Sequence, residues 1–311
     1  MEIFALLLQR DQISVLTLAV IFSQCSDASS SVRAKALFIF GECIESKHST
    51  MVDIFNTIFS SEQQQTSLTD REETDLLDLL HEESEAEISS AMLPSAAAVL
   101  GLLKERAIDE KVYVRKSALQ LILTLAKRNR QLLTKDILKL LGDSCMDVAL
   151  LIRRHMAQML TELVASYQDH LSLKNVWVRS VLPLVMDREN RVQEKTLECL
   201  DQLILKSLVD DDSMLAWSLL EIITEQGLVS YLSKAIETFA RQKMLSPRLI
   251  KVLLDNTEQH GKAALTSLAV ISRHTSPGSN VKVTLQTHLF FFFNYLSFDP
   301  GFFHLLAIII H

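Results

Sequence analysis

The residues best suited to bind another molecule are Lys and Arg side chains between positions 104 and 154, where twelve bases stand against six acids. The chain as a whole carries a net charge of −7, so this stretch is basic within an acidic protein. Lys and Arg that face a nucleic acid neutralise its phosphates, which gives binding that ignores base sequence and weakens with salt. Six of these residues are therefore DNA-binding candidates: Lys111, Lys116, Lys127, Arg128, Arg130 and Arg154.

A structural explanation competes for some of the basic residues. Arg115 and Arg153 recur at one position of an internal repeat, so hydrogen bonding to the turn of a neighbouring repeat explains them better than ligand binding. Lys127, Arg128 and Arg130 lie just past the end of a predicted helix, where cationic side chains also stabilise the negative helix terminus. For these three residues both interpretations stay open.

Catalytic and metal-binding motifs are missing from the sequence. It contains no GxGxxG, Walker A, HExxH or GxSxG motif, and no two of its nine histidines fall at metal-ligand spacing. The four cysteines are far apart and form no CxxC pair, as in a reduced, intracellular chain: Cys25, Cys43, Cys145 and Cys199. We therefore expect no catalytic residue, cofactor, metal ion or small-molecule substrate, and predict that the protein is not an enzyme.

The helices that would carry these residues follow from an internal repeat. One pattern begins at positions 27, 109, 147 and 187, with Asp first, an apolar residue at +5, Arg at +6, and further mostly apolar residues at +9, +10 and +13. Positions +5, +9, +10 and +13 share one helix face, and Asp is a favourable N-cap. Each copy therefore predicts an amphipathic helix that its Asp caps. The signature residues to which we assign a structural role are Asp27, Arg33, Asp109, Arg115, Asp147, Arg153 and Asp187.

The fourth copy departs from the pattern, because Gln193 replaces Arg and Thr196 replaces the small apolar residue. Apolar segments precede the four copies after short turns, and further helices are expected in the C-terminal third. The expected ranges are 12–23, 95–105, 135–141, 176–186, 215–224, 228–241, 247–256 and 262–272. A helical hairpin cannot bury its apolar face alone, so successive hairpins must stack. The spacing of about 40 residues predicts an all-α, HEAT-type α-solenoid of stacked helical hairpins.

The composition divides the chain into four parts. HEAT-like repeats are expected over 1–60 and 91–275, separated by an acidic, Ser/Gln-rich insert over 61–90. The insert contains ten acids and a single base between positions 62 and 87, a balance typical of a disordered, solvated loop. A docking segment or a phosphorylation target is the alternative for this loop.

The fourth part, residues 276–311, holds half of the fourteen phenylalanines. Its last apolar run approaches the length of a membrane span, but Asn294, Asp299 and Pro300 interrupt it. We therefore expect a divergent, Phe-rich tail and not a membrane anchor.

The strongest copy reads Val114-Arg115-Lys116-Ser117-Ala118-Leu119-Gln120, and an acidic insert precedes it. With this core, residues 1–273 resemble the large HEAT-repeat subunits of condensin, most of all the D-type subunit of condensin II. Because the chain opens within a repeat array, we expect a fragment or shortened isoform of a longer protein. The resemblance implies a non-catalytic, nuclear, chromosome-associated scaffold that contributes to mitotic chromosome condensation. It also implies kleisin and SMC subunits, DNA and chromatin, including histones, as partners.

Two other hypotheses stay open from the sequence. A HEAT scaffold of the transport-receptor or phosphatase-regulatory type would bind a protein partner without binding nucleic acid. A protein tethered through its Phe-rich tail would need detergent for extraction from membranes.

Overall fold

The structure is a computed structural model that describes residues 15–45, 53–54, 56, 58–59, 94–210, 213–275 and 283. Within these ranges every regular element is a helix, which confirms the predicted all-α, HEAT-type fold class. The helices form two compact units, which meet in the sequence between Thr134 and Lys135. This boundary falls inside the stretch 91–275 that we predicted as one array. The acidic insert and, apart from Val283, the Phe-rich tail lie outside the described residues.

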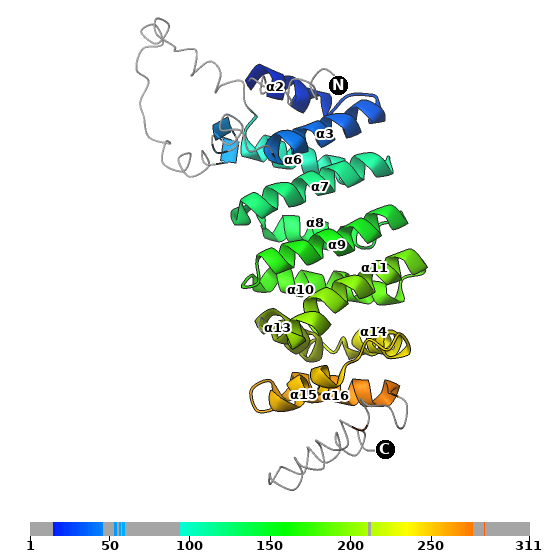
Figure 1. Cartoon of the computed structure of the whole chain (residues 1–311). Coiled ribbons are helices and arrows are strands. Elements are labelled where there is room, and N and C mark those ends of the chain that lie inside the picture. The colour runs from blue at the N-terminus through cyan, green and yellow to red at the C-terminus, as the bar shows by residue number, and fades with distance from the viewer. Residues whose placement is uncertain are drawn as a thin grey trace, which may run out of the picture. The chain divides into compact units, whose positions relative to one another are not determined.

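The first unit consists of stacked helical hairpins (Figure 1). Its helices are α2 (Val15–Gln24), α3 (Ser30–Glu45), α6 (Ala96–Arg106), α7 (Val112–Arg128) and the short 3-10 helix η4 (Arg130–Leu132). Helix α2 packs on α3 and α6 packs on α7, while α3 and α7 pack against each other along their lengths. Two hairpins thus lie side by side although the acidic insert separates them in sequence.

The second unit repeats this arrangement. It begins with α8 (Lys135–Ser144), α9 (Leu150–Ser166), α10 (Leu171–Ser180), the 3-10 helix η5 (Leu182–Met186) and α11 (Asn190–Leu200). It continues with the π-helical η6 (Asp201–Lys206), α12 (Ser207–Val209), α13 (Met214–Glu225), α14 (Val229–Arg241), α15 (Pro247–Asp255) and α16 (Gly261–His274). Helix α9 packs on α11 and α8 on α10, and α16 then packs on α13 and α14. From α8 to α11, the first helix of each hairpin packs on the first helix of the next and the second on the second, which gives two layers there.

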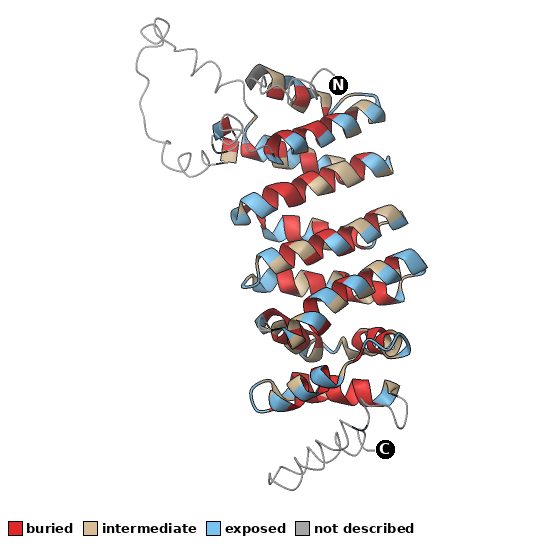
Figure 2. Ribbon diagram, viewed as in Figure 1, coloured by how far each residue is buried: buried red, intermediate tan, exposed pale blue. Residues whose placement is uncertain are grey.

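The predicted apolar stripe forms the core between neighbouring helices, as Figure 2 shows by the buried residues along each helix. In α7, Val114, Ala118, Leu119 and Ile122 are all at most 2% exposed. The corresponding four residues of α9 are buried completely. In the first and fourth copies one stripe residue each, Val32 and Leu197, is only half-buried. The periodicity of the signature therefore identifies the core-facing side of each helix.

The prediction that the four signature aspartates are N-caps is wrong. Helix α7 is capped at Lys111, α9 at Ala149 and α11 at Glu189, in each case two residues after the Asp. Each Asp instead forms a turn before the helix, in which its Oδ1 accepts a hydrogen bond from the backbone N–H two residues on. The distances from the backbone nitrogen to Asp Oδ1 are 2.7 Å for Ser29 and Asp27, 2.9 Å for Lys111 and Asp109, 2.7 Å for Ala149 and Asp147, and 2.9 Å for Glu189 and Asp187.

The bounds predicted for the helix over 176–186 are also wrong. The helix α10 ends at Ser180, and the 3-10 helix η5 follows it with Pro183 in its first turn. Proline has no N–H group to donate and clashes with the preceding turn of an α-helix. The chain therefore leaves the α-helical path before Pro183 and tightens into a 3-10 turn.

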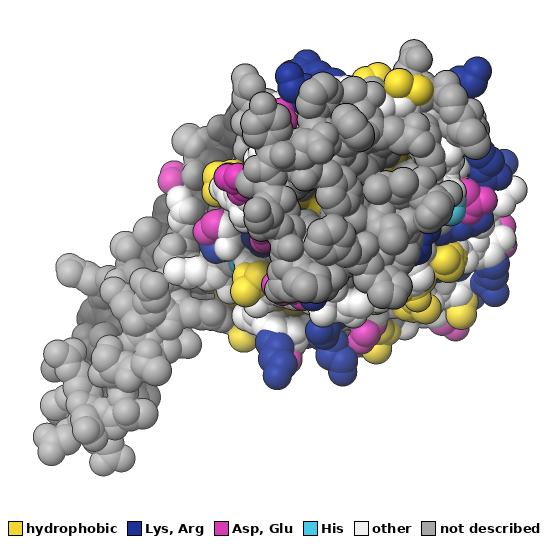
Figure 3. Space-filling model, turned by 90° about the horizontal axis from the view of Figure 1, so that it is seen from below, with side chains coloured by type: hydrophobic (Ala, Val, Ile, Leu, Met, Phe, Trp, Pro, Cys, Tyr) yellow, Lys and Arg dark blue, Asp and Glu magenta, His cyan; other side chains and the backbone are white. Residues whose placement is uncertain are grey.

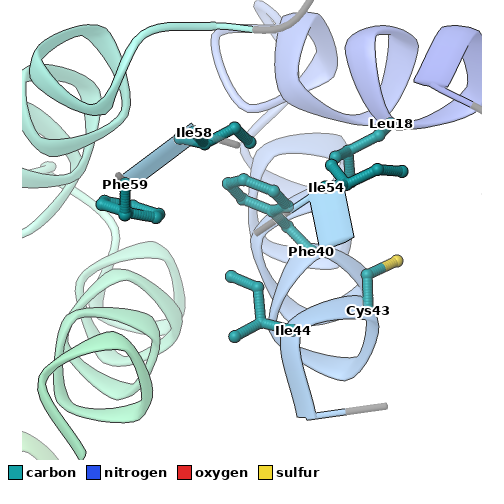
Figure 4. Close-up of a pocket in the computed structure, with 7 residues that line it drawn as sticks. All are labelled: Leu18, Phe40, Cys43, Ile44, Ile54, Ile58 and Phe59. Carbon is teal, nitrogen blue, oxygen red and sulfur yellow. The ribbon is translucent and has the colours of Figure 1, made fainter. Parts of the chain in front are cut away.

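A small apolar cavity of about 10 Å³ lies in the core of the first unit (Figure 4). Side chains from α2, α3 and the following segment converge on it: Leu18, Phe40, Cys43, Ile44, Ile54, Ile58 and Phe59. A cavity of this size holds at most one water molecule, and its lining offers that water almost no polar partner. We therefore assign it to core packing and not to ligand binding.

Candidate nucleic-acid interface

The signature arginines make buried links between consecutive copies of the repeat. In the first unit, Arg33 Nε donates to Asp109 Oδ2 at 2.9 Å and Arg33 Nη2 donates to Asp109 Oδ1 at 3.0 Å. The remaining nitrogen, Nη1, donates to the backbone carbonyls of Asp27 and Ala28 at 2.9 and 3.0 Å. One guanidinium thus connects the turn of its own copy with the aspartate of the next copy.

The second unit contains the same link. Arg153 Nε and Nη2 donate to the two carboxylate oxygens of Asp187 at 2.7 and 2.9 Å, and Nη1 donates to the carbonyls of Asp147 and Val148. Only 5% and 7% of the Arg153 and Asp187 side chains are exposed. In such a bidentate arginine–carboxylate pair, two parallel hydrogen bonds fix the geometry in addition to the charge attraction.

The environment of these aspartates changes their acidity. Burial alone would raise the pKa of Asp187, but the hydrogen bonds from Arg153 and from the Glu189 N–H, together with the Arg153 charge, lower it below the usual range. Asp109 follows the same pattern: burial acts upward, while Arg33, the Lys111 N–H and Arg106 bring its pKa down. Both carboxylates are therefore charged partners of the arginines at neutral pH.

The other two copies also make the contact to their own turn. Arg115 Nη1 donates to the carbonyls of Asp109 and Glu110 at 2.9 and 3.3 Å. In the fourth copy, the Gln193 amide donates to the Asp187 carbonyl at 2.5 Å, which preserves the contact to its own turn. Arg33, Arg115 and Arg153 are at most 8% exposed, so a nucleic acid cannot reach their guanidinium groups. Their geometry supports the structural explanation.

The candidate DNA-binding residues occupy separate places. Lys111 precedes α7 and Lys116 lies in its second turn, whereas Lys127 and Arg128 lie in its last turn and Arg130 lies in η4. A helix of 17 residues is about 25 Å long, so these five residues form two groups at opposite ends of α7.

Most of these side chains are accessible. Lys116 is half-buried, and the other four candidates of the first unit are exposed. The sixth candidate, Arg154, is exposed on α9 of the second unit, at the repeat position equivalent to that of Lys116. On the face drawn in Figure 3, Lys and Arg side chains stand at several places, among acidic and apolar ones. The accessible bases of the first unit thus stand in two small groups, one near each end of α7.

Sequence reasoning missed a set of exposed apolar residues at the turns. The residue before the signature Asp is large and apolar in three copies, and these residues, Ile108, Met146 and Met186, are 74%, 73% and 50% exposed. In the second unit, Met146 and Met186 line a groove of about 530 Å³ together with Val148 and Arg188. The sequence did contain a signal for these residues, because a large apolar residue recurs directly before the signature Asp, outside the stripe that faces the core. Exposed apolar residues that gather in this way are typical of contact surfaces.

The described residues hold neither a metal-binding cluster nor an exposed cysteine. No group of three or more His, Cys, Asp or Glu residues there could hold a metal ion. The four cysteines are buried free thiols, and burial raises the pKa of Cys25, Cys43 and Cys145 to about 12. A thiol with so high a pKa is a poor nucleophile at neutral pH. No helix among the described residues has the length and apolar character required to cross a membrane.

The paired helices and the repeated arginine–aspartate links define both units as HEAT-like repeat arrays, a class of binding scaffold. No protein-family model matches the sequence. The chain is, however, 30% identical over 302 residues to subunit D3-L of the condensin-2 complex of Xenopus laevis, covering 86% of this chain and 20% of that protein. It is 33% identical over 271 residues to condensin-2 subunit D3 of Mus musculus, covering 78% of this chain and 18% of that protein.

A plant relative shows the same similarity. Condensin-2 subunit CAP-D3 of Arabidopsis thaliana is 27% identical over 193 residues, which is 62% of this chain and 13% of that protein. The chain is thus a condensin-2 D3-like HEAT-repeat chain. It spans about a fifth of the length of the Xenopus laevis and Mus musculus relatives.

Proposed function

We propose that this chain is a non-catalytic scaffold segment of a condensin-type complex and contributes to mitotic chromosome condensation. The observation that carries the proposal is the similarity to condensin-2 D3 subunits, which extends over most of the chain in animal relatives. HEAT-like hairpins support it, because such arrays bind other macromolecules along extended surfaces. The proposed location is the nucleus, in association with chromosomes.

The proposed partners are the kleisin and SMC subunits of the complex, together with DNA and chromatin, including histones. The names of the relatives describe them as subunits of the condensin-2 complex, which supports the protein partners. The exposed bases at the two ends of α7 support DNA as a partner, because sequence-independent DNA binding depends on such side chains. The exposed Met146 and Met186 support a protein contact at the turns of the second unit.

Co-purification with the condensin-2 kleisin subunit tests the proposal. The full chain, co-expressed with that kleisin, should elute with it as one complex in size-exclusion chromatography. Replacement of both Met146 and Met186 by Asp places charges in the turn groove and should weaken the complex. Replacement of Met244, which is 41% exposed outside that groove, by Asp is the matched control and should have no effect. Separate elution of the wild-type chain and the kleisin at micromolar concentration would contradict the proposal.

A further inference from the structure

A second pocket of the second unit has the character of a ligand site. It encloses about 460 Å³, which is within the range of pockets that hold small ligands or peptide side chains. Residues of α10 and α13 line it, together with His260, which is the N-cap of α16. The N-terminal turns of three helices therefore border this space, each with the positive end of its dipole.

The central feature of this pocket is a buried lysine. Lys174 is 9% exposed, and its ammonium group donates a hydrogen bond of 2.6 Å to Ser218 Oγ. Among the described residues, no carboxylate lies within 4 Å of that ammonium group. A buried charge is costly unless an opposite charge accompanies it. Lys174 therefore has no direct ion-pair partner among the described residues, although Asp169 and Glu221 line the same pocket.

The walls of the pocket combine apolar and polar surfaces. Trp217 is 3% exposed and stacks on His260, with ring centroids 4.4 Å apart and planes 5° apart. His260 Nδ1 lies 2.7 Å from Glu221 Oε1, which fixes the orientation of the imidazole. Met214 stands 81% exposed at the rim. A ligand that enters would meet the exposed Met214 beside the Lys174 ammonium, with the nearly buried Trp217 behind them.

We propose that this Lys174 pocket binds an acidic side chain of a partner polypeptide, either a carboxylate or a phosphorylated residue. The oxyanion would pair with Lys174, and an adjacent apolar side chain would pack on the exposed Met214, close to Trp217. A single oxyanion fits better than a nucleic acid, because Asp169 and Glu221 also line the pocket and repel a polyanion. The inference rests on Lys174 and the residues that line its pocket, and it does not depend on the condensin proposal.

The two tryptophans allow a direct test with the full chain. Only Trp217 lines the pocket, whereas Trp177 is fully buried and donates its indole N–H to Thr161 at 2.9 Å. We would titrate three capped peptides, Leu-phosphoserine-Leu, Leu-Glu-Leu and Leu-Ser-Leu, and follow both indole N–H resonances by NMR. At least one acidic peptide should shift the Trp217 resonance saturably, while the Ser peptide and the Trp177 resonance show no change.

Inorganic phosphate serves as the ion control in this titration. A saturable shift with phosphate that neither acidic peptide reproduces would overturn the assignment of a peptide ligand. The absence of a saturable Trp217 shift with both acidic peptides would overturn the pocket itself. A failure of the kleisin co-purification leaves this titration unaffected, so the two proposals can be judged apart.

A substitution of the lysine gives a second, independent readout. Lys174→Met removes the buried charge and keeps the apolar stem, so it should raise the Tm of the unliganded chain and abolish the peptide-induced shift. Lys262→Met on α16 removes an exposed charge and should leave both quantities unchanged. Peptide binding that persists in Lys174→Met would overturn the role of the ammonium group.

Discussion

At the scale of single residues, the arginine–aspartate links explain why Asp and Arg recur in the signature. Arg153 satisfies two carbonyls of its own turn and both carboxylate oxygens of Asp187. The pair is nearly inaccessible, so removal of one partner leaves an uncompensated buried charge, which typically costs about 3–5 kcal/mol. The signature residues therefore specify how one copy docks on the next.

We predict that Asp187→Asn lowers the free energy of unfolding by about 3 kcal/mol at pH 7, because Arg153 loses its anionic partner. Urea denaturation followed by circular dichroism measures this change. Asp210→Asn, at an exposed carboxylate, is the control and should cost less than about 0.5 kcal/mol. A similar loss in both variants would refute a special role for the Asp187 pair.

The lowered pKa of Asp187 also predicts a pH dependence. Because its folded pKa lies below that of the unfolded chain, its contribution is complete above the ordinary Asp pKa of about 3.9 and disappears as pH falls through the folded value. The stability difference between wild type and Asp187→Asn should therefore shrink on acidification below about pH 4. A difference that stays constant from pH 7 to pH 3 would contradict this assignment.

At the scale of helices, burial of the stripe in α7 makes its small residues sensitive to charge. We predict that Ala118→Asp unfolds the first unit or destabilises it by several kcal/mol, because Ala118 is 0% exposed and a carboxylate there has no partner. Ala97→Asp, at an exposed position in the first turn of α6, is the matched control, and the helix dipole favours it. Thermal unfolding by circular dichroism distinguishes the two, and equal Tm values would contradict the observed packing.

Much of the helical arrangement could be predicted because the apolar periodicity and the scarcity of Gly and Pro act locally. The exact role of the signature Asp could not be predicted, since an N-cap and a turn residue two positions earlier favour the same residue type. The boundary between Ser180 and Leu182 was missed because the effect of Pro183 was overlooked.

Features that depend on tertiary contacts were beyond the reach of sequence patterns. Arg33 and Asp109 are neighbours only because the hairpins on either side of the acidic insert stack. The Lys174 pocket likewise combines α10, α13 and the start of α16, which no local motif connects. The basic candidates of the first unit fall into two groups because α7 is long. Their positions in the sequence alone did not reveal this separation.

At the scale of the whole molecule, the chain contains HEAT-like units with accessible basic groups and a similarity to condensin-2 D3 subunits. We predict that replacement of Lys127, Arg128 and Arg130 by Glu weakens DNA binding without loss of helical content. Exposed charges contribute little to stability, whereas each lost phosphate contact should reduce the salt slope of binding by about one. The matched control replaces three exposed bases of the second unit, Arg248, Lys251 and Lys262, and should bind as wild type does.

The most direct test of a DNA-binding condensin-type scaffold is a mobility-shift titration of the full chain with duplex DNA from about 50 to 200 mM salt. The account predicts binding to unrelated sequences at the lowest salt and an affinity that falls steeply, linearly in logarithmic coordinates, as salt rises. Absence of binding at the lowest salt, or an affinity that does not change with salt, would contradict DNA binding by this scaffold. The scaffold would then bind only protein partners.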